Sequence, residues 1–170
     1  MDSTEQQSVF GEWVERHSRI IYRVVNGFAS GEDRNDLLQE VLLAVWKSIP
    51  SFRKEAKATT YLYRVCHNAA LLWMRGEKRY RRHVEELSEF SLGTDAGARS
   101  AMDERLAEVY GAIRKLKAMD RSLVLLSLDG LNYREMAEVS GLSESHVGVK
   151  LNRIRNQLSE LLKGDRNEPK

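Results

Sequence analysis

The stretch YREMAEVSGLSESHVGVKLNRIRNQL, residues 133–158, decides the fold of the C-terminal part of the chain. Ala137 is followed four residues later by Gly141, then Leu142, and five residues on by Val147. A small residue lets two helices cross closely, and glycine accepts the positive φ of a tight turn. The spacing therefore predicts two short helices joined by a glycine turn.

The second of these helices has two chemically different sides. Ser143 is a suitable N-cap, and residues 143–146 would form the first turn. One apolar seam steps by four, three, four and three residues along Val147, Leu151, Ile154, Leu158 and Leu161. The other side carries polar and basic residues that suit a DNA major groove: Ser145, His146, Lys150, Asn152, Arg153, Arg155 and Asn156. A purely structural helical hairpin would explain the seam equally well, but it leaves the basic side unexplained.

Composition limits the remaining possibilities. The chain has 170 residues, 42% hydrophobic and 31% charged, with two prolines and no long alternating β-type run. This predicts a mostly helical protein of one or two small domains. No apolar stretch approaches the ~20 residues of a membrane span, and residues 1–26 do not resemble a signal peptide, so we expect no membrane insertion and a cytoplasmic location. Cys66, the single cysteine, is expected in the core.

Catalytic signatures are missing from the sequence. The four histidines are scattered, and no HExxH pair, GxSxG elbow, GxxxxGK loop or Cys/His metal spacing occurs. We therefore predict that the protein is not an enzyme and has no metal site, catalytic residue or cofactor.

The first part of the chain contains further amphipathic helices. A broad apolar stripe runs through Leu38, Val41, Leu42, Val45, Trp46 and Ile49 and ends at Pro50. Its opposite side carries Asp36, Gln39, Glu40 and Lys47, which could be solvated or could dock a basic partner. Upstream, residues 10–25 show similar order and predict a second helix or a helix pair.

A third helical segment follows and runs into a basic cluster. From about Thr60 it should turn inward Leu62, Val65, Cys66, Ala69, Leu72 and Trp73. Within eight residues come Arg75, Lys78, Arg79, Arg81 and Arg82, with Tyr80 between them. Cations at this density can neutralise phosphates while an aromatic ring stacks on unpaired bases. They could also simply favour the negative end of a helix dipole.

An acidic stretch separates the two basic parts. Residues 84–111 carry two Lys/Arg against seven Asp/Glu, with two glycines near the centre. The predicted organisation is all-α: a helical domain at 1–84, a flexible acidic linker at 85–105, a helix-turn-helix domain at 106–164 and a disordered tail at 165–170.

These segments resemble a known family. The stretches DLLQEVLLAVWKSIPSF and TTYLYRVCHNAALLWMR resemble region 2 of bacterial sigma-70 factors, and DRSLVLLSLDGLNYREMAEVSGLSESHVGVKLNRIRNQLSELL resembles region 4. Nothing between them is large enough for a region 3 domain. That arrangement is similar to the extracytoplasmic-function (ECF, group IV) sigma factors.

The resemblance implies a function and its partners. It predicts a transcription initiation factor that binds core RNA polymerase, at the clamp of the largest subunit and at the flap, and directs it to promoter DNA. An anti-sigma factor is also implied as a partner. The alternative is a helix-turn-helix regulator that binds operator DNA without polymerase. An anti-sigma or adaptor protein would not need two basic surfaces.

The resemblance also assigns residues by position. Core polymerase binding is expected at Asp36, Leu37, Gln39, Glu40 and Leu43. Minus-10 DNA binding is expected at Phe52, Arg53, Lys54, Lys57, Thr59, Thr60, His67, Asn68, Arg75, Lys78, Arg79, Arg81 and Arg82. Minus-35 DNA binding is expected at Arg134, Ser143, Glu144, Ser145, His146, Lys150, Arg153 and Arg155.

Two positions depart from the family pattern. The chain has Leu116-Lys117-Ala118-Met119 where the family usually has a Leu-Pro pair, so the entry to region 4 should differ. Gly148 stands inside the recognition helix, where a glycine costs ~1 kcal/mol relative to alanine but lets backbone approach DNA closely.

Overall fold

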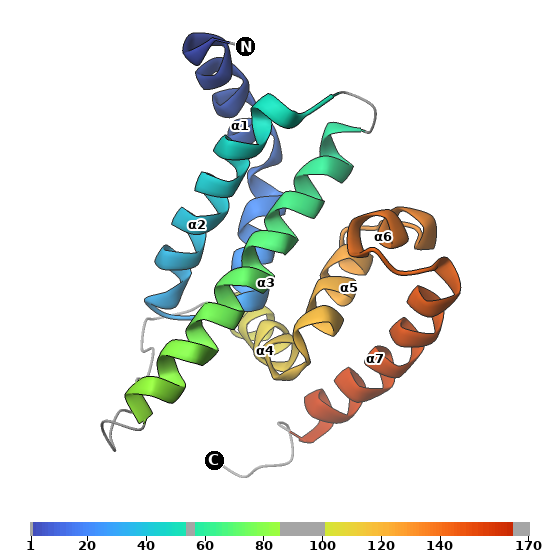
Figure 1. Cartoon of the computed structure of the whole chain (residues 1–170). Helices are drawn as coiled ribbons and strands as arrows, with labels where there is room; N and C mark the ends of the chain where they lie inside the picture. The colour runs from blue at the N-terminus through green and yellow to red at the C-terminus, as the bar shows by residue number, and fades with distance from the viewer. Residues whose placement is uncertain (1, 54–56, 86–100, 165–170) are drawn as a thin grey trace.

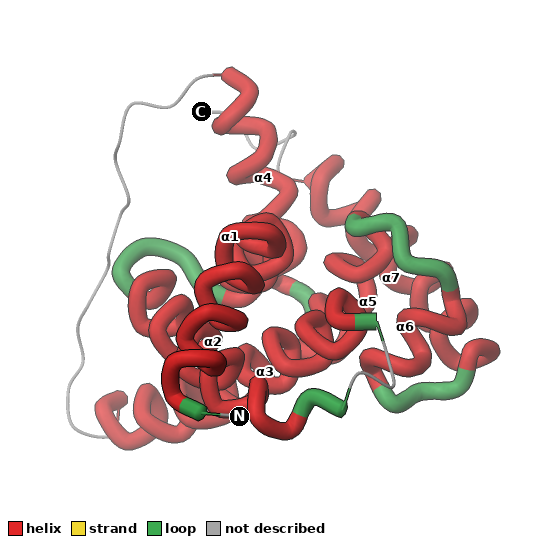
Figure 2. Tube along the Cα trace, turned by 90° about the horizontal axis from the view of Figure 1, so that it is seen from above, coloured by secondary structure: helices red, strands yellow, loops and turns green. Residues whose placement is uncertain are grey.

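The computed structural model of the chain is built from helices (Figure 1). It describes residues 2–53, 57–85 and 101–164, without the side chains of 78–85 and 101–103. These ranges contain no strand, as Figure 2 shows, which confirms the all-α prediction. The elements are α1 (Ser3–Phe28), α2 (Asp33–Ser48), the 3₁₀-helix η1 (Ile49–Ser51), α3 (Ala58–Glu85), α4 (Ala101–Lys115), α5 (Ala118–Leu128), α6 (Tyr133–Ser140) and α7 (Glu144–Gly164).

Helices α1, α2 and α3 form the N-terminal bundle. Helix α1 begins with a capping box in which Asp2 and Glu5 each accept the other's backbone N–H. Its backbone leaves helical geometry at His17, where φ is −120° and ψ is 18°, so two helical halves meet at a kink, in agreement with the predicted helix or helix pair. Helix α2 ends at Ser48, and Pro50 lies in η1, in agreement with the predicted stop.

Helices α4 to α7 form the C-terminal group. The sharp junction between α4 and α5 lacks the family's proline, and Arg121 takes part in closing it. Its Nε donates to the carbonyl of Leu116 at 2.9 Å, and its Nη2 donates to the carbonyl of Arg114. A side chain of α5 thus satisfies carbonyls at the end of α4 that a helix terminus leaves without partners.

The predicted linker is partly helical. Helix α3 continues to Glu85, and α4 begins at Ala101, so residues 85 and 101–105 of the predicted linker are helical. Helix α4 begins upstream of residue 106, where the C-terminal domain was expected to start, and its apolar residues include the buried Ile113. Residues 86–100 and the predicted tail 165–170 lie outside the described residues.

The two groups share one continuous core. The cluster of buried residues runs from Trp13 and Val24 in α1 through Cys66 in α3 to Leu125 in α5 and Leu151 in α7. Helices α1 and α3 pack directly against α5, and α3 also packs against α6. In Figure 1, α5 accordingly lies between α3 and α7.

Candidate nucleic-acid interface

The outer face of α2 presents four of the five predicted polymerase-binding residues. Asp36, Gln39, Glu40 and Leu43 are all exposed, and their spacing of three, one and three places them on one side of the helix. The fifth residue, Leu37, is fully buried. Its side chain belongs to the bundle core and does not lie on this exposed face, and its role in binding stays a prediction.

A groove of about 420 Å³ lies between α2 and α3 beside this face. Leu43 and Lys47 line one wall, and Leu72 and Trp73 line the other. Leu72 is 64% exposed, so the prediction that it points inward is wrong. It follows the apolar period of α3, but no described element covers that part of the helix.

The loop after η1 carries the first group of predicted minus-10 residues. Phe52 is half-buried and contacts the rings of Trp13 and Tyr61, at centroid distances of 5.2 and 5.0 Å. Arg53 and Lys57 are exposed. Lys54 lies outside the described residues. This loop therefore presents two exposed cations next to an anchored aromatic ring.

The predicted minus-10 residues on α3 are divided between surface and core. Thr59 is half-buried, Asn68 is exposed, and Thr60 is buried. His67 is 3% exposed and lies against the rings of Phe28 and Tyr63. Burial lowers its pKa to about 3, and no described group bonds its Nδ1 atom. Neither Thr60 nor His67 reaches the surface in this arrangement, and their contact with DNA stays a prediction.

The predicted phosphate-binding cluster extends past the described side chains. Arg75 is exposed near the end of the described part of α3. The backbone of α3 carries Lys78, Arg79, Arg81 and Arg82, but their side chains lie outside the described residues. Their contact with DNA stays a prediction.

The helix-turn-helix forms as the sequence predicts. Gly141 has φ of +74° and its N–H donates to the carbonyl of Ala137. The Ser143 hydroxyl accepts the backbone N–H of His146 at 3.3 Å, which is the geometry of an N-cap. A second capping box, of Asn132 and Glu135, begins α6. The turn is thus fixed by local bonds at both helix starts.

Most predicted minus-35 residues lie on the exposed side of α7. Ser143, Glu144, Ser145, His146, Arg153 and Arg155 are exposed. Arg134 is also exposed, and its Nε lies 3.6 Å from Glu138 one turn along α6. An exposed pair of this kind is weak, so Arg134 keeps the freedom to approach a phosphate.

Lys150 differs from the other predicted residues of α7. Its ammonium lies 3.0 Å from the Asp120 carboxylate of α5, and the two side chains are 35% and 16% exposed. Asp120 binds Lys150 in this structure, and the contact of Lys150 with DNA stays a prediction. Sequence periodicity could not show this pair, since its members are 30 residues apart.

The structure shows the surroundings of two further residues of α7, Val149 and Gly148. Val149, which the sequence did not single out, is 62% exposed between Ser145 and Arg153. An apolar side chain there can contact a thymine methyl group. Gly148 faces α6: a Cβ atom would lie 3.3 Å from Cε2 of Tyr133. The missing side chain at 148 therefore accommodates the tyrosine ring.

Comparison with known proteins identifies both helical groups. The family model for sigma-70 region 2 matches residues 13–80, and the model for sigma-70 region 4 matches residues 106–158. The chain belongs to the sigma-70 family. The two matches together cover most of the chain and have the order of an ECF-type sigma factor, which this protein is.

Several relatives of this sigma factor are known. The RNA polymerase sigma factor CnrH of Cupriavidus metallidurans is 28% identical, over 94% of this chain and 89% of CnrH. The ECF sigma factor SigM of Mycobacterium tuberculosis is 27% identical, over 90% of this chain and 76% of SigM. The solved structure of Bartonella quintana RpoE in complex with the anti-sigma factor NepR superposes with a TM-score of 0.71 at 21% identity, covering 92% of this chain and 98% of RpoE.

Other site types find no support in the described residues of this sigma factor. Residues 2–53, 57–85 and 101–164 contain no group of three acidic, histidine or cysteine side chains that could hold a metal ion. None of the helices described there is both long and apolar enough to cross a membrane.

Proposed function

We propose that this sigma factor binds core RNA polymerase through the outer face of α2 and directs it to promoters by reading two DNA elements. Region 2 would hold the minus-10 element through the loop after η1 and the basic end of α3. Region 4 would read the minus-35 element as duplex, with the exposed side of α7 in the major groove. The observation that carries the proposal is the presence of both modules, in this order, in one chain.

The α2 face supports the polymerase contact. Asp36 and Glu40 stand one turn apart on an exposed surface, and the adjoining groove adds the exposed apolar side chain of Leu43. A centre of apolar contact surrounded by charges is the usual anatomy of a protein interface. The clamp of the largest polymerase subunit is the expected partner here, and the flap is the expected partner of region 4.

The two proposed DNA-binding surfaces, the loop after η1 and the exposed side of α7, suit different forms of DNA. The loop after η1 places Arg53 and Lys57 next to the Phe52 ring, which suits an unpaired strand. Helix α7 instead presents exposed side chains from Ser145 to Arg153 that are polar except for Val149, which suits base edges and thymine methyl groups in a duplex. The factor would act by binding alone, without catalysis, in the cytoplasm.

An anti-sigma factor is the expected inhibitor. The solved structures of Bartonella RpoE with NepR and of CnrH with the cytosolic domain of CnrY each show a sigma factor in complex with such a partner. This chain resembles CnrH with a TM-score of 0.66 at 25% identity. By analogy, an anti-sigma protein would occupy surfaces that this factor uses to bind polymerase.

The proposal is tested by the variant Asp36→Arg in a binding assay with purified core polymerase. Charge reversal at an exposed position should leave the fold intact, and we expect the affinity for core to fall about tenfold, or about 1.4 kcal/mol. Glu15→Arg is the matched control, because it makes the same charge change at an exposed site of α1. Transcription from promoter fragments should fall in parallel with core binding for Asp36→Arg and stay normal for the control.

Two results would contradict the proposal. If the folded wild-type chain does not bind core polymerase at all, it is not an initiation factor. If Asp36→Arg and Glu15→Arg bind core equally well, the α2 face is not the polymerase interface.

A further inference from the structure

Val149 lies in the middle of the exposed side of α7, opposite the apolar seam of the helix. It follows the buried Val147 by two residues, which is about 200° around an α-helix. Three further exposed residues share this side at helical spacing: Ser145, Asn152 and Asn156. Together with Val149 they form the central row, which faces away from the core of region 4.

The valine contributes nothing to the core of region 4. Its side chain is 62% exposed, whereas Val147 and Leu151 are buried in the seam. Within residues 144–164, which the structure describes in full, no other large apolar side chain is strongly exposed. Single exposed apolar residues are common on protein surfaces. The informative feature is therefore the place of Val149, in the middle of the side that would face base pairs.

Side-chain length changes across the exposed side of α7. No side chain in the central row is longer than asparagine. Arg153 and Arg155 lie on the two opposite flanks of this row. Long cations at the flanks can reach phosphates and position the helix, while short side chains in the middle let its backbone lie close to the base edges. A side chain as short as valine can reach a base only in such an arrangement.

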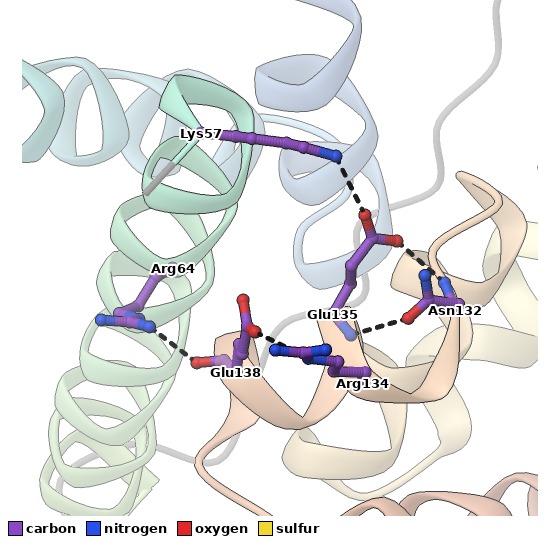
Figure 3. A network of polar contacts seen from close by, with 6 residues as sticks. All are labelled: Lys57, Arg64, Asn132, Arg134, Glu135 and Glu138. Atoms are coloured by element: carbon purple, nitrogen blue, oxygen red, sulfur yellow. Dashed lines mark hydrogen bonds and ion pairs between the residues drawn. The ribbon is translucent and has the colours of Figure 1, made fainter. Parts of the chain in front are cut away.

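Another apolar side chain adjoins this helix. Tyr133 is the first residue of α6, and the capping box of Asn132 and Glu135 fixes the start of that helix (Figure 3). A Cβ atom on Gly148 would lie 3.3 Å from Cε2 of Tyr133, and the tyrosine is 43% exposed. The backbone next to Val149 is thus bare, and no side chain at position 148 stands between it and DNA.

The major groove of DNA offers one apolar group to such a surface. Thymine carries a methyl group at C5, whereas the other groups on the base edges are hydrogen-bond donors and acceptors. Val149 can neither donate nor accept, so against those groups it would leave a polar atom without a partner. Contact with the methyl group instead removes two apolar surfaces from water. Valine has one strongly preferred rotamer in a helix, so the contact costs little side-chain freedom.

We propose that Val149 reads the C5-methyl group of one pyrimidine in the minus-35 element, and that a base carrying this group is bound in preference to one that lacks it. This inference rests on the proposed function of α7. Thymine is one source of the group, and 5-methylcytosine presents it at the same place in the groove. Methylation of a cytosine at this position therefore strengthens promoter binding.

A uracil scan locates the contact. The full-length factor, bound to core polymerase, first selects fragments from a promoter pool in which the minus-35 element is random. Each thymine of the selected element is then replaced in turn by uracil, which removes the methyl group and retains every donor and acceptor. We expect the affinity of the holoenzyme to fall about fourfold at one central thymine, the equivalent of about 0.8 kcal/mol for one buried methyl group.

The variant Val149→Ala assigns the contact to its side chain. Truncation of an exposed side chain to a better helix former should leave the fold intact. The variant should bind the thymine and uracil fragments equally, because its side chain no longer reaches the methyl group. Leu106→Ala is the matched control: it shortens another exposed apolar side chain of region 4, outside the helix-turn-helix. This control should retain the fourfold preference for thymine.

Cytosine and 5-methylcytosine at the same position separate a methyl contact from recognition of thymine as a base. The wild type should bind the methylated fragment about fourfold more tightly than the unmethylated one. Val149→Ala should bind the two equally. Equal binding of both fragments by the wild type would overturn the reading of a methyl group.

The remaining outcomes distinguish this inference from the proposed function. A selected element without a uracil-sensitive thymine, or a Val149→Ala variant that retains the full uracil effect, would overturn the role of Val149 and leave the sigma function in place. If the selection enriches no minus-35 sequence, region 4 does not read this element, and the inference fails with that part of the proposed function. If the folded chain does not bind core polymerase, both proposals fail.

Discussion

Burial of His67 makes the stability of this sigma factor depend on pH, and the variant His67→Phe tests this. The imidazole lies in the core against the rings of Phe28 and Tyr63, at centroid distances of 6.2 and 6.5 Å. Its Nδ1 atom has no described partner. A phenyl ring has a similar shape and needs no hydrogen bond, so we expect the variant to fold.

The expected magnitude follows from the pKa of His67. Desolvation lowers this pKa from 6.5 to about 3 in the folded protein. Between about pH 6.5 and pH 3, the imidazole of His67 is protonated in the unfolded chain but neutral in the folded chain. The free energy of unfolding therefore falls by about 1.4 kcal/mol for each pH unit below about 6.5. Between pH 7 and pH 5 the wild type should lose about 2 kcal/mol through this group. That loss is a large fraction of a typical unfolding free energy of about 5–15 kcal/mol.

Urea unfolding at both pH values, followed by circular dichroism, measures this difference. Wild type should lose about 2 kcal/mol more than His67→Phe between pH 7 and pH 5. His146→Gln is the control, because His146 is exposed at the start of α7 and its replacement should retain the wild-type pH dependence. Equal losses in the wild type and in His67→Phe would show that His67 is not buried as a neutral ring, and its predicted role at the DNA surface would return.

Two further predictions concern glycines of the helix-turn-helix. Gly148→Ala should raise the free energy of unfolding, measured in urea, by up to about 1 kcal/mol, because alanine is the better helix former. The nearest neighbour of the new methyl group, Tyr133, is 43% exposed and can move aside. A loss of stability would mean that the tyrosine ring is fixed. Gly141→Ala should lower the free energy of unfolding by about 1–2 kcal/mol, because φ of +74° disfavours any residue with a Cβ; an unchanged unfolding midpoint would contradict the turn geometry.

Local patterns in the sequence predicted the elements of this protein well. The positive φ of Gly141 and the N-cap at Ser143 follow from residues that are neighbours in the chain, and both are confirmed. The seam of α7 is confirmed at Val147, Leu151 and Ile154, which are buried. Such features depend on one helix and its turn, so that spacing alone contains the information.

Long-range contacts explain where the structure places side chains differently from the sequence predictions. Leu72 has the helical period of a core residue, but no described segment covers it. Lys150 has the position of a DNA-contacting residue, but Asp120, from another helix, binds it. The family motif places Leu37 at the polymerase-binding surface, whereas its side chain lies on the side of α2 that packs into the bundle core. None of these outcomes is visible without the packing of one helix on another.

Several residues that were predicted to bind partners are exposed, as such binding requires. Asp36, Glu40 and Arg153 lie where their roles need them, and their contacts with partners stay predictions. The packing of α1 on α5 had no signal in the sequence, because Gly27 and its neighbour Leu125 match no motif and lie about a hundred residues apart.

The close packing at Gly27 has a consequence for how this factor can change over generations. Gly27 of α1 is buried, and a Cβ atom placed on it would lie 2.5 Å from Cδ1 of Leu125 in α5. A glycine codon becomes an alanine codon through a single base substitution, so one heritable step is enough to strain the packing of α1 on α5 without changing any residue assigned to DNA or polymerase.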